Sequence, residues 1–362
     1  MLTESDFFAS SQTALPDEGR YSWSAPSNIA IVKYWGKKDN QIPANPSASI
    51  TLNRCQTMTN VSFKKSSSPG FDLYFDGEKK DAFRPKISKF LERIAQYCPY
   101  LDRLQLTIET SNTFPHSSGI ASSASGMAAL AVNVMSIERL LNPEMTDEYF
   151  NRKASFLARL GSGSACRSID GKIVVWGNHR DVESSDLYGV PFEKIHREFE
   201  GYKDTILLVD KGEKKVSSSA GHDLMHKHPF AQQRFDQAHE NLSDLLRIFE
   251  TGDLDGFVKL AESEALTLHS MMMTSMPYFI LMRPNTLEII NRIWNFRADT
   301  NIPVCFTLDA GANVHLLYPA QFESEVNELI KSDLSRFCQN DHYICDEMGT
   351  GAVQLTQSEN IG

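Results

Sequence analysis

Apolar and polar residues alternate over several stretches of the N-terminal third of the chain, a period that is typical of half-buried strands. The alternation covers residues 47–63 and 71–75, residues 28–35 are rich in β-branched and aromatic residues, and residues 104–109 form a further expected strand. A helical spacing first occurs over residues 85–97, where Ile87, Phe90 and Ile94 recur every three or four positions. The N-terminal part therefore predicts several strands and one helix.

Helical spacing dominates the rest of the chain, with short apolar strands between the helices. The expected helices cover residues 127–141, 147–160, 229–249, 254–273, 284–296 and 322–332. The expected strands cover residues 172–176, 205–210, 304–308 and 314–318. Because this order is not a regular alternation of strand and helix, it predicts an α+β fold. We expect an N-terminal arm over residues 1–22, one lobe over 23–200 and a second over 201–362.

A loop of small residues opens the first of these later helices. Residues 114–126 read F-P-H-S-S-G-I-A-S-S-A-S-G. The first N–H groups of a helix lack intrahelical partners and carry the positive end of its dipole, so this entrance suits a phosphate. A serine N-cap on a buried helix is the alternative. The pattern G-x-x-x-x-G-K-[ST] occurs nowhere in the chain, which disfavours a P-loop NTPase.

Two further loops of small residues follow. Residues 161–168 (G-S-G-S-A-C-R-S) carry Arg167, whose guanidinium can hold a carboxylate or phosphate through two hydrogen bonds. Alternatively, Gly161 simply ends a helix and Arg167 pairs with an acid of the protein. Residues 214–221 (K-K-V-S-S-S-A-G) form a third serine loop next to two lysines.

A lysine-rich strand end and one aspartate complete the candidate chemistry. Residues 33–38 read K-Y-W-G-K-K, and Asp309 precedes Ala310 and Gly311. With a polyanionic ligand, loop amides would hold phosphates, the lysines would screen charge, and Asp309 could take a proton from an attacking hydroxyl. Taken alone, Asp309 is equally typical of a turn residue that binds its own backbone.

The composition restricts the classes of ligand and the cellular location that are compatible with the chain. With 362 residues, 41% of them hydrophobic, the chain can bury a substantial core. The formal charge of −10 argues against nucleic-acid and anionic-membrane binding, so an anionic ligand needs a local cationic pocket. We find no run of about 18 apolar residues and no signal-peptide pattern. Six cysteines without C-x-x-C spacing predict reduced thiols in a cytoplasmic protein.

Taken together, five segments resemble the successive signature segments of the diphosphomevalonate decarboxylases. They are residues 25–37 (A-P-S-N-I-A-I-V-K-Y-W-G-K), 112–126, 161–167, 214–221 and 306–313. These enzymes belong to the superfamily of galactokinase, homoserine kinase, mevalonate kinase and phosphomevalonate kinase. The resemblance covers most of the chain. It implies a two-lobed fold with an N-terminal lobe like domain 2 of ribosomal protein S5 and a ferredoxin-like C-terminal lobe.

The resemblance implies ATP-dependent decarboxylation of mevalonate 5-diphosphate to isopentenyl diphosphate, ADP, phosphate and carbon dioxide, with Mg²⁺, in isoprenoid biosynthesis. Asp309 would orient or deprotonate the C3 hydroxyl for attack on the γ-phosphate of ATP, and Lys33 would stabilise the charge there. Arg167 and Asn28 match positions that hold the substrate carboxylate and orient the aspartate, and Ser123 matches a catalytic serine. Loss of the phosphorylated C3 oxygen and then of the carboxylate would form the double bond.

The resemblance also implies which residues bind the two substrates. The residues expected around the substrate diphosphate are Tyr34, Lys37, Ser162, Ser164 and Ser218, with Arg84 in a loosely matching segment. The residues expected around the ATP phosphates are Pro115, Ser118, Gly119, Ile120, Ala121, Ser122 and Ser123. No metal ligand is identified. The relatives also lead us to expect a homodimer.

The chain departs from the family pattern at a few positions. His116, Ser117 and Ser118 stand where many members have Thr-Ala-Ala, and Ser219 stands where some bacterial members have an arginine. The alternatives are a decarboxylase of a related mevalonate phosphate, a small-molecule kinase of the same fold, and a non-catalytic binding protein. Lys33 together with Asp309 favours decarboxylation, and Lys37 favours a phosphorylated substrate.

Overall fold

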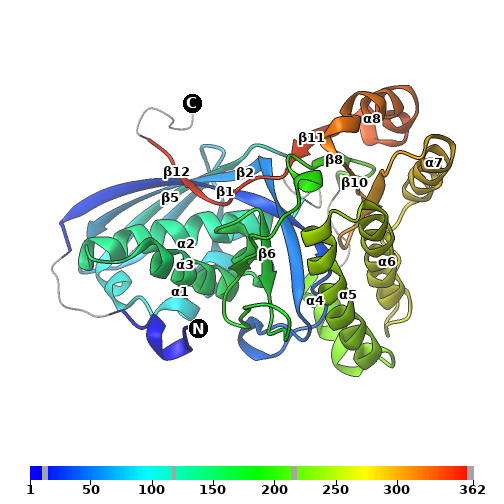
Figure 1. The fold of residues 1–362 in the computed structure, drawn as a ribbon. Helices are drawn as coiled ribbons and strands as arrows, with labels where there is room; N and C mark the ends of the chain where they lie inside the picture. Colours follow the sequence, from blue (N-terminus) through cyan, green and yellow to red (C-terminus); the bar gives the residue numbers. More distant parts are fainter. Residues whose placement is uncertain (10–14, 116–119, 213–217, 357–362) are drawn as a thin grey trace.

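The computed structural model describes residues 1–9, 15–115, 120–212 and 218–356, with the backbone only at residues 218–220. Its strands form two sheets, one built mainly from the N-terminal half of the chain and one from the C-terminal half (Figure 1). Helices lie against both sheets. The α+β arrangement with two lobes is thus confirmed.

The larger sheet runs in the order β12-β1-β2-β5-β3-β4, and β6 and β7 extend it next to β2. Its strands are β1 (Glu18–Val32), β2 (Ser47–Lys65), β3 (Gly70–Phe75), β4 (Glu78–Lys79), β5 (Leu104–Asn112), β6 (Ile173–Trp176), β7 (Val190–Pro191) and β12 (Val353–Gln354). β3 and β5 pair in parallel, whereas β1 and β2 pair antiparallel. Their register places Val32 opposite Ala48, so the end of β1 lies beside the start of β2.

Three helices cover one face of this sheet (Figure 1). They are α1 (Arg84–Ile94), α2 (Ser122–Leu141) and α3 (Asp147–Gly161). Apolar residues of the helices and of β2, β3 and β5 form one core, which includes Phe63, Ile108 and Phe156. By length and composition α2 could span a membrane, but 83% of its most apolar window is buried inside the protein, as in a core helix.

The smaller sheet runs in the order β11-β8-β10-β9. Its strands are β8 (Lys203–Leu207), β9 (Cys305–Thr307), β10 (Val314–Tyr318) and β11 (Tyr343–Glu347). The helices of this part are α4 (Ser218–Leu224), α5 (Ala231–Thr251), α6 (Leu254–Met273), α7 (Pro284–Thr300) and α8 (Glu323–Leu329). α6 packs against β9, and both α5 and α6 also reach β1 of the larger sheet. The two halves of the chain therefore meet at the end of β1.

Most expected strands and helices are found within a few residues of their predicted limits, but β1 is much longer than the strand expected over residues 28–35. It begins at Glu18, inside the segment that we expected to be an arm (1–22), and it ends at Val32. Antiparallel pairing with β2 stabilises the additional residues, and the ladder runs as far as Pro26 before its first irregularity. Tyr21 and Trp23 pack against the core from this part of the strand.

The C-terminal segment contains strands that the sequence pattern did not predict. β11 joins the smaller sheet, whereas β12 returns to the larger one, where Trp23 and Ser24 face Gln354 and Val353. The chain leaves the larger sheet after β7 and enters the smaller one at β8. The lobe boundary expected near residue 200 stays a prediction. All six cysteines are free, as expected.

Candidate active site

Loops that lie far apart in the sequence line one cavity of about 570 Å³. The end of β1, the start of α2, the turn after α3 and the turn between β9 and β10 all contribute to it. The predicted site residues that line the cavity are Asn28, Lys33, Tyr34, Lys37, Ile120, Ala121, Ser122, Ser123, Ser162, Ser164, Arg167 and Asp309. The structure thus brings most of the predicted positions together.

Cationic side chains dominate the charged lining of the cavity. Among the described residues that line it, Lys33, Lys37, Lys86 and Arg167 are cationic, and Asp309 supplies the single carboxylate. The chain as a whole has a formal charge of −10, so this excess of positive charge is local. It will attract and hold an anionic ligand.

Lys33 and Asp309 form an ion pair inside the cavity. Nζ of Lys33 lies 3.1 Å from Oδ1 of Asp309, and the lysine side chain is 2% exposed against 30% for the aspartate. Burial lowers the pKa of Lys33, while the Asp309 carboxylate opposes that shift. His269 of α6 donates from Nε2 to the carbonyl oxygen of Asp309 at 3.1 Å. The acid is therefore held in place and remains open to the cavity.

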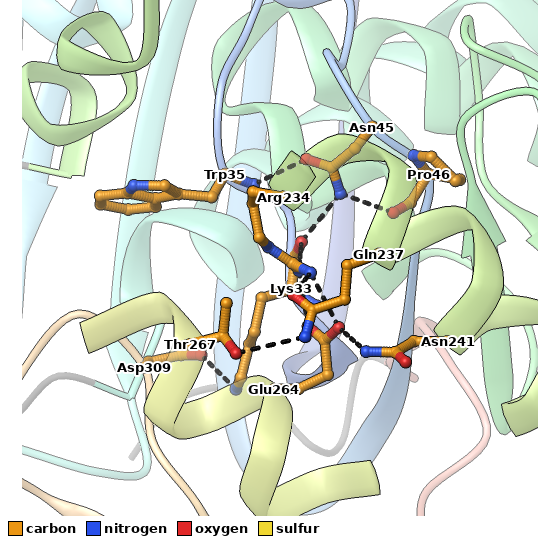
Figure 2. Close-up of polar contacts among 10 residues, drawn as sticks. All are labelled: Lys33, Trp35, Asn45, Pro46, Arg234, Gln237, Asn241, Glu264, Thr267 and Asp309. Carbon is orange, nitrogen blue, oxygen red and sulfur yellow. Dashed lines mark hydrogen bonds and ion pairs between the residues drawn. The ribbon is translucent and has the colours of Figure 1, made fainter. Parts of the chain in front are cut away.

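A buried ion pair from two C-terminal helices holds the main chain of Lys33 (Figure 2). Arg234 of α5 binds Glu264 of α6 through two hydrogen bonds of 2.9 and 2.6 Å, and both side chains are fully buried. The N–H of Lys33 donates to Glu264 at 2.9 Å, and its carbonyl oxygen accepts from Arg234 at 3.1 Å. Asn45 donates to the same carbonyl oxygen at 2.9 Å. The strand end that carries Lys33 is thus attached to the other half of the molecule.

Arg167 lies in a 3-10 turn after α3 and is 2% exposed. It donates from Nε to Ser49 Oγ at 3.0 Å and from a terminal nitrogen to Ser47 Oγ at 2.7 Å. Among the described residues, no acid forms an ion pair with it. A buried guanidinium that is bound only by neutral hydroxyls is costly without an anion. Of the two alternatives for Arg167, the structure therefore favours ligand binding.

The loop that opens α2 is held against β1. Ser27 donates from its hydroxyl to the carbonyl oxygen of Ile120 at 2.9 Å, and Ala121 adopts a left-handed conformation (φ 37°) directly before the helix. Ser122 and Ser123, the first residues of α2, both line the cavity, and the first amides of a helix lack intrahelical partners. The hydroxyls of Ser123 and Ser162 lie 3.4 Å apart, so two of the small-residue loops meet here.

Tyr34 and Lys37 follow Lys33 along the chain and line the same cavity. A Cβ on Gly163 would lie 2.9 Å from Trp176 and 3.0 Å from the hydroxyl of Tyr34, so a glycine is needed for this close packing. Lys37 pairs with Asp223 at 3.4 Å across a partly exposed contact.

Asn28 is buried and donates to Ser168 Oγ at 2.8 Å, which fixes its amide at the cavity.

Several predicted positions are not placed at the cavity. Arg84 donates to the carbonyl oxygen of Phe71 at 2.9 Å and lies over its ring, and it does not line the cavity, whereas Lys86 of the same helix does. Pro115 is described but is not part of the lining either. Ser118, Gly119 and the side chain of Ser218 lie outside the described residues. Their roles stay predictions.

The sequence did not indicate the residues that support the site from the C-terminal helices. Arg234, Glu264 and His269 lie in segments whose helical spacing predicted only packing. Their function depends on contacts with residues 30 or more positions away. No short motif marks such contacts. His222, which follows the third serine loop and lines the cavity, was missed as well.

The residues present fit a magnesium nucleotide better than a protein-held metal. Among the described residues, no group of three or more His, Cys, Asp or Glu side chains is placed to hold a metal ion. Mg²⁺ commonly takes one or two carboxylates and fills its remaining positions with phosphates and water. Asp309 is the carboxylate available in the cavity. A magnesium ion would therefore be held largely by the phosphates of its nucleotide.

The two-lobed α+β fold and its cationic cavity agree with the small-molecule kinase superfamily that the sequence resemblance implied. Models of two domain families match it: the diphosphomevalonate decarboxylase-like N-terminal domain over residues 25–187 and the mevalonate 5-diphosphate decarboxylase C-terminal domain over residues 205–360. The chain belongs to the diphosphomevalonate decarboxylase family.

Individual relatives agree with this assignment. The diphosphomevalonate decarboxylase of Saccharomyces cerevisiae is 30% identical over 326 residues, which cover 84% of this chain and 79% of the relative. The crystal structure of mevalonate diphosphate decarboxylase from Staphylococcus aureus superimposes with a TM-score of 0.81 at 28% identity, covering 94% of this chain and 98% of the other. The structure of MDDEF in complex with MVAPP, AMPPCP and magnesium gives a TM-score of 0.80 at 28% identity, covering 93% and 99%.

Proposed function

We propose that this chain decarboxylates mevalonate 5-diphosphate at the expense of ATP, with isopentenyl diphosphate, ADP, phosphate and carbon dioxide as products. The observation that carries the proposal is the Lys33–Asp309 pair at 3.1 Å, in a cavity whose Arg167 is bound only by serine hydroxyls among the described residues. A reaction on a hydroxy acid needs one group for the hydroxyl and another for the carboxylate. Asp309 and Arg167 supply these two groups.

In the first step, Asp309 accepts a hydrogen bond from the C3 hydroxyl and directs its oxygen at the γ-phosphate of ATP. The amides at the start of α2 hold the phosphates, and Lys33 offsets the charge that develops between the two reactants. Asp309 takes the hydroxyl proton as the new P–O bond forms and the bond to the ADP oxygen breaks. Mg²⁺, when bound, neutralises the phosphates of the nucleotide.

In the second step, the phosphorylated C3 oxygen leaves as phosphate and takes the bonding electrons with it. The C–C bond to the carboxylate then breaks, its electrons form the double bond, and carbon dioxide is released. Arg167, held by Ser47 and Ser49, keeps the carboxylate in position until departure of the phosphate makes C3 electron-poor. Asn28 lines the same cavity as Arg167 and orients the reacting groups.

We place the adenine of ATP in the apolar part of the cavity, past the loop that opens α2. Leu73, Ile87 and Ile108 line this recess together with Met127 and Leu130 of α2. A flat, weakly polar ring suits such a surface. The nucleotide would then run from this recess along the amides of α2 towards Asp309.

A product assay tests the proposed function. Purified enzyme with ATP, Mg²⁺ and mevalonate 5-diphosphate should release carbon dioxide and ADP in equal amounts, while mevalonate and its 5-phosphate should react poorly. MDDEF, which binds MVAPP and AMPPCP, has the same fold and supports this choice of substrates. ADP formation with a stable phosphorylated product and no carbon dioxide would instead identify a kinase.

We also place the enzyme in the cytoplasm. Six free cysteines, five of them buried, support a reducing compartment. The expected homodimer stays a prediction, which sedimentation of the purified protein would test.

A further inference from the structure

His222 is a cavity residue to which the proposed chemistry gives no role. It belongs to α4, the short helix after the third serine loop, and it is 9% exposed. Its ring centroid lies 4.2 Å from that of Tyr34 and 4.7 Å from that of Trp35, with tilts of 33° and 40°. Two neighbouring aromatic residues at the end of β1 therefore fix the plane of the imidazole.

A backbone hydrogen bond fixes the tautomer of His222. The N–H of Gly36 donates to Nδ1 at 3.0 Å, so the neutral ring carries its proton on Nε2. Burial, and to a lesser extent Lys37 and Arg167, lower the pKa of His222 to about 3, so that the ring is neutral at physiological pH. Among the described residues, Nε2 has no hydrogen-bond partner. The ring thus brings one unused N–H donor to the cavity that it lines.

The surroundings of His222 indicate what this donor binds. Lys37 and Arg167 are close enough to affect its titration, and Lys37 also pairs with Asp223, the residue after His222. A group bound between these cations must be an anion with several acceptor oxygens. A phosphate fits because it accepts hydrogen bonds from charged and neutral donors alike.

We propose that His222 donates a hydrogen bond from Nε2 to a phosphate oxygen of the substrate diphosphate, next to Lys37. This inference rests on the proposed function, because it takes the phosphorylated substrate from there. His222 thereby becomes a substrate-binding residue that adds a donor without adding charge. The contacts with the Tyr34 and Trp35 rings and the Gly36 N–H position this donor before the substrate arrives, which reduces the entropy lost on binding.

Substitutions at His222 separate donor from packing. His222→Phe keeps the ring contacts with Tyr34 and Trp35 but removes both the Nε2 donor and the acceptor of the Gly36 N–H. KM for mevalonate 5-diphosphate should rise about 10-fold while kcat stays within about twofold. His222→Gln returns an N–H near the position of Nε2 and should recover part of the loss. His228→Phe is the matched control, because His228 is equally buried but bonds Met271 outside the cavity. It should leave KM unchanged.

Binding of inorganic pyrophosphate to the wild-type chain provides a test that does not depend on turnover. In ¹⁵N spectra of the histidine rings, pyrophosphate should shift Nε2 of His222 and leave His228 unmoved, and His222→Phe should weaken pyrophosphate binding in calorimetry. If this happens in an enzyme that releases no carbon dioxide, the proposed function fails and the role of His222 stands. An unmoved Nε2 signal under saturating pyrophosphate, or an unchanged KM in a folded, active His222→Phe enzyme, would overturn the inference.

Discussion

At the scale of single residues, the proposed chemistry depends on three charged side chains and on the residues that hold them in place. Lys33, Arg167 and Asp309 belong to three segments whose residue types indicated a ligand site, and the structure brings all three to one cavity. The partners of these residues could not be predicted. Ser47 and Ser49 appear in the sequence as part of an ordinary strand, and only the fold places them against Arg167. A motif records the residues at the site, whereas long-range contacts position them.

Replacing Arg167 by lysine tests whether the reaction depends on the geometry of this cation as well as on its charge. Arg167→Lys keeps the charge but loses the planar fork that contacts two serines, so kcat/KM for mevalonate 5-diphosphate should fall about 10- to 100-fold. Affinity for ATP alone should change little. Steady-state kinetics and ATP titration measure both quantities.

Arg84→Lys is the matched control for this substitution. Arg84 lies over Phe71 and does not line the cavity, so its replacement should leave kcat/KM close to wild type. Equal losses for the two variants would contradict the assignment of Arg167 to the substrate and would return Arg84 to the list of candidates.

At the scale of elements, the periodicity predicted most strands and helices but gave no sign of how they act together. α5 and α6 were recognised from helical spacing alone, which explains burial on one face of each helix. The structure adds that Arg234 and Glu264, one from each helix, hold both polar groups of the Lys33 backbone (Figure 2). β1 was predicted too short because its first half depends on pairing with the long β2.

Glu264→Gln tests whether this pair of helices positions Lys33. The substitution removes the charge opposite Arg234, so kcat should fall about 10-fold or more while KM for ATP is unchanged, measured at a temperature where the variant is fully folded. Glu262→Gln is the control. Glu262 lies on the same helix but forms its ion pair with Arg297, at 2.7 Å, and not with the Lys33 backbone. Both variants should lose stability, but only the first should lose turnover. A similar kcat for both would show that the pair is merely structural.

At the scale of the whole molecule, the predicted α+β class and two lobes are correct, and the final path of the chain was not foreseen. The end of the chain returns from the smaller sheet to form β12 beside β1. Two residues in a strand carry too little periodicity to reveal such a pairing. The site lies where the two halves of the chain meet, so the protonation of its buried groups should affect the stability of the entire fold.

The free energy of unfolding should decrease as the pH is lowered, because two buried histidines resist protonation in the folded state. Burial is the first cause that lowers the pKa of His222 to about 3 and that of His269 to about 4. Between these values and the unfolded pKa of about 6.5, only the unfolded chain binds the protons, so stability is complete above pH 6.5 and is lost as pH falls. Each histidine contributes a slope of about 1.4 kcal/mol per pH unit.

His222→Phe isolates one of these two contributions. Urea unfolding between pH 4 and pH 6 should give a free energy whose slope against pH is lower in the variant by about 1.4 kcal/mol per unit. The difference in slope, rather than the absolute stability, is the relevant quantity. Parallel pH profiles for the two proteins would contradict a neutral, buried His222.

The most direct measurement of the central claim is carbon dioxide release by Asp309→Asn. Asparagine has nearly the same shape but cannot take the proton of the C3 hydroxyl, and it loses the ion pair with Lys33. We predict that ATP and mevalonate 5-diphosphate still bind within a few-fold of wild type, whereas carbon dioxide release per enzyme falls about 10²-fold or more. Release at the wild-type rate by a folded Asp309→Asn enzyme would contradict the assignment of this carboxylate to the reaction.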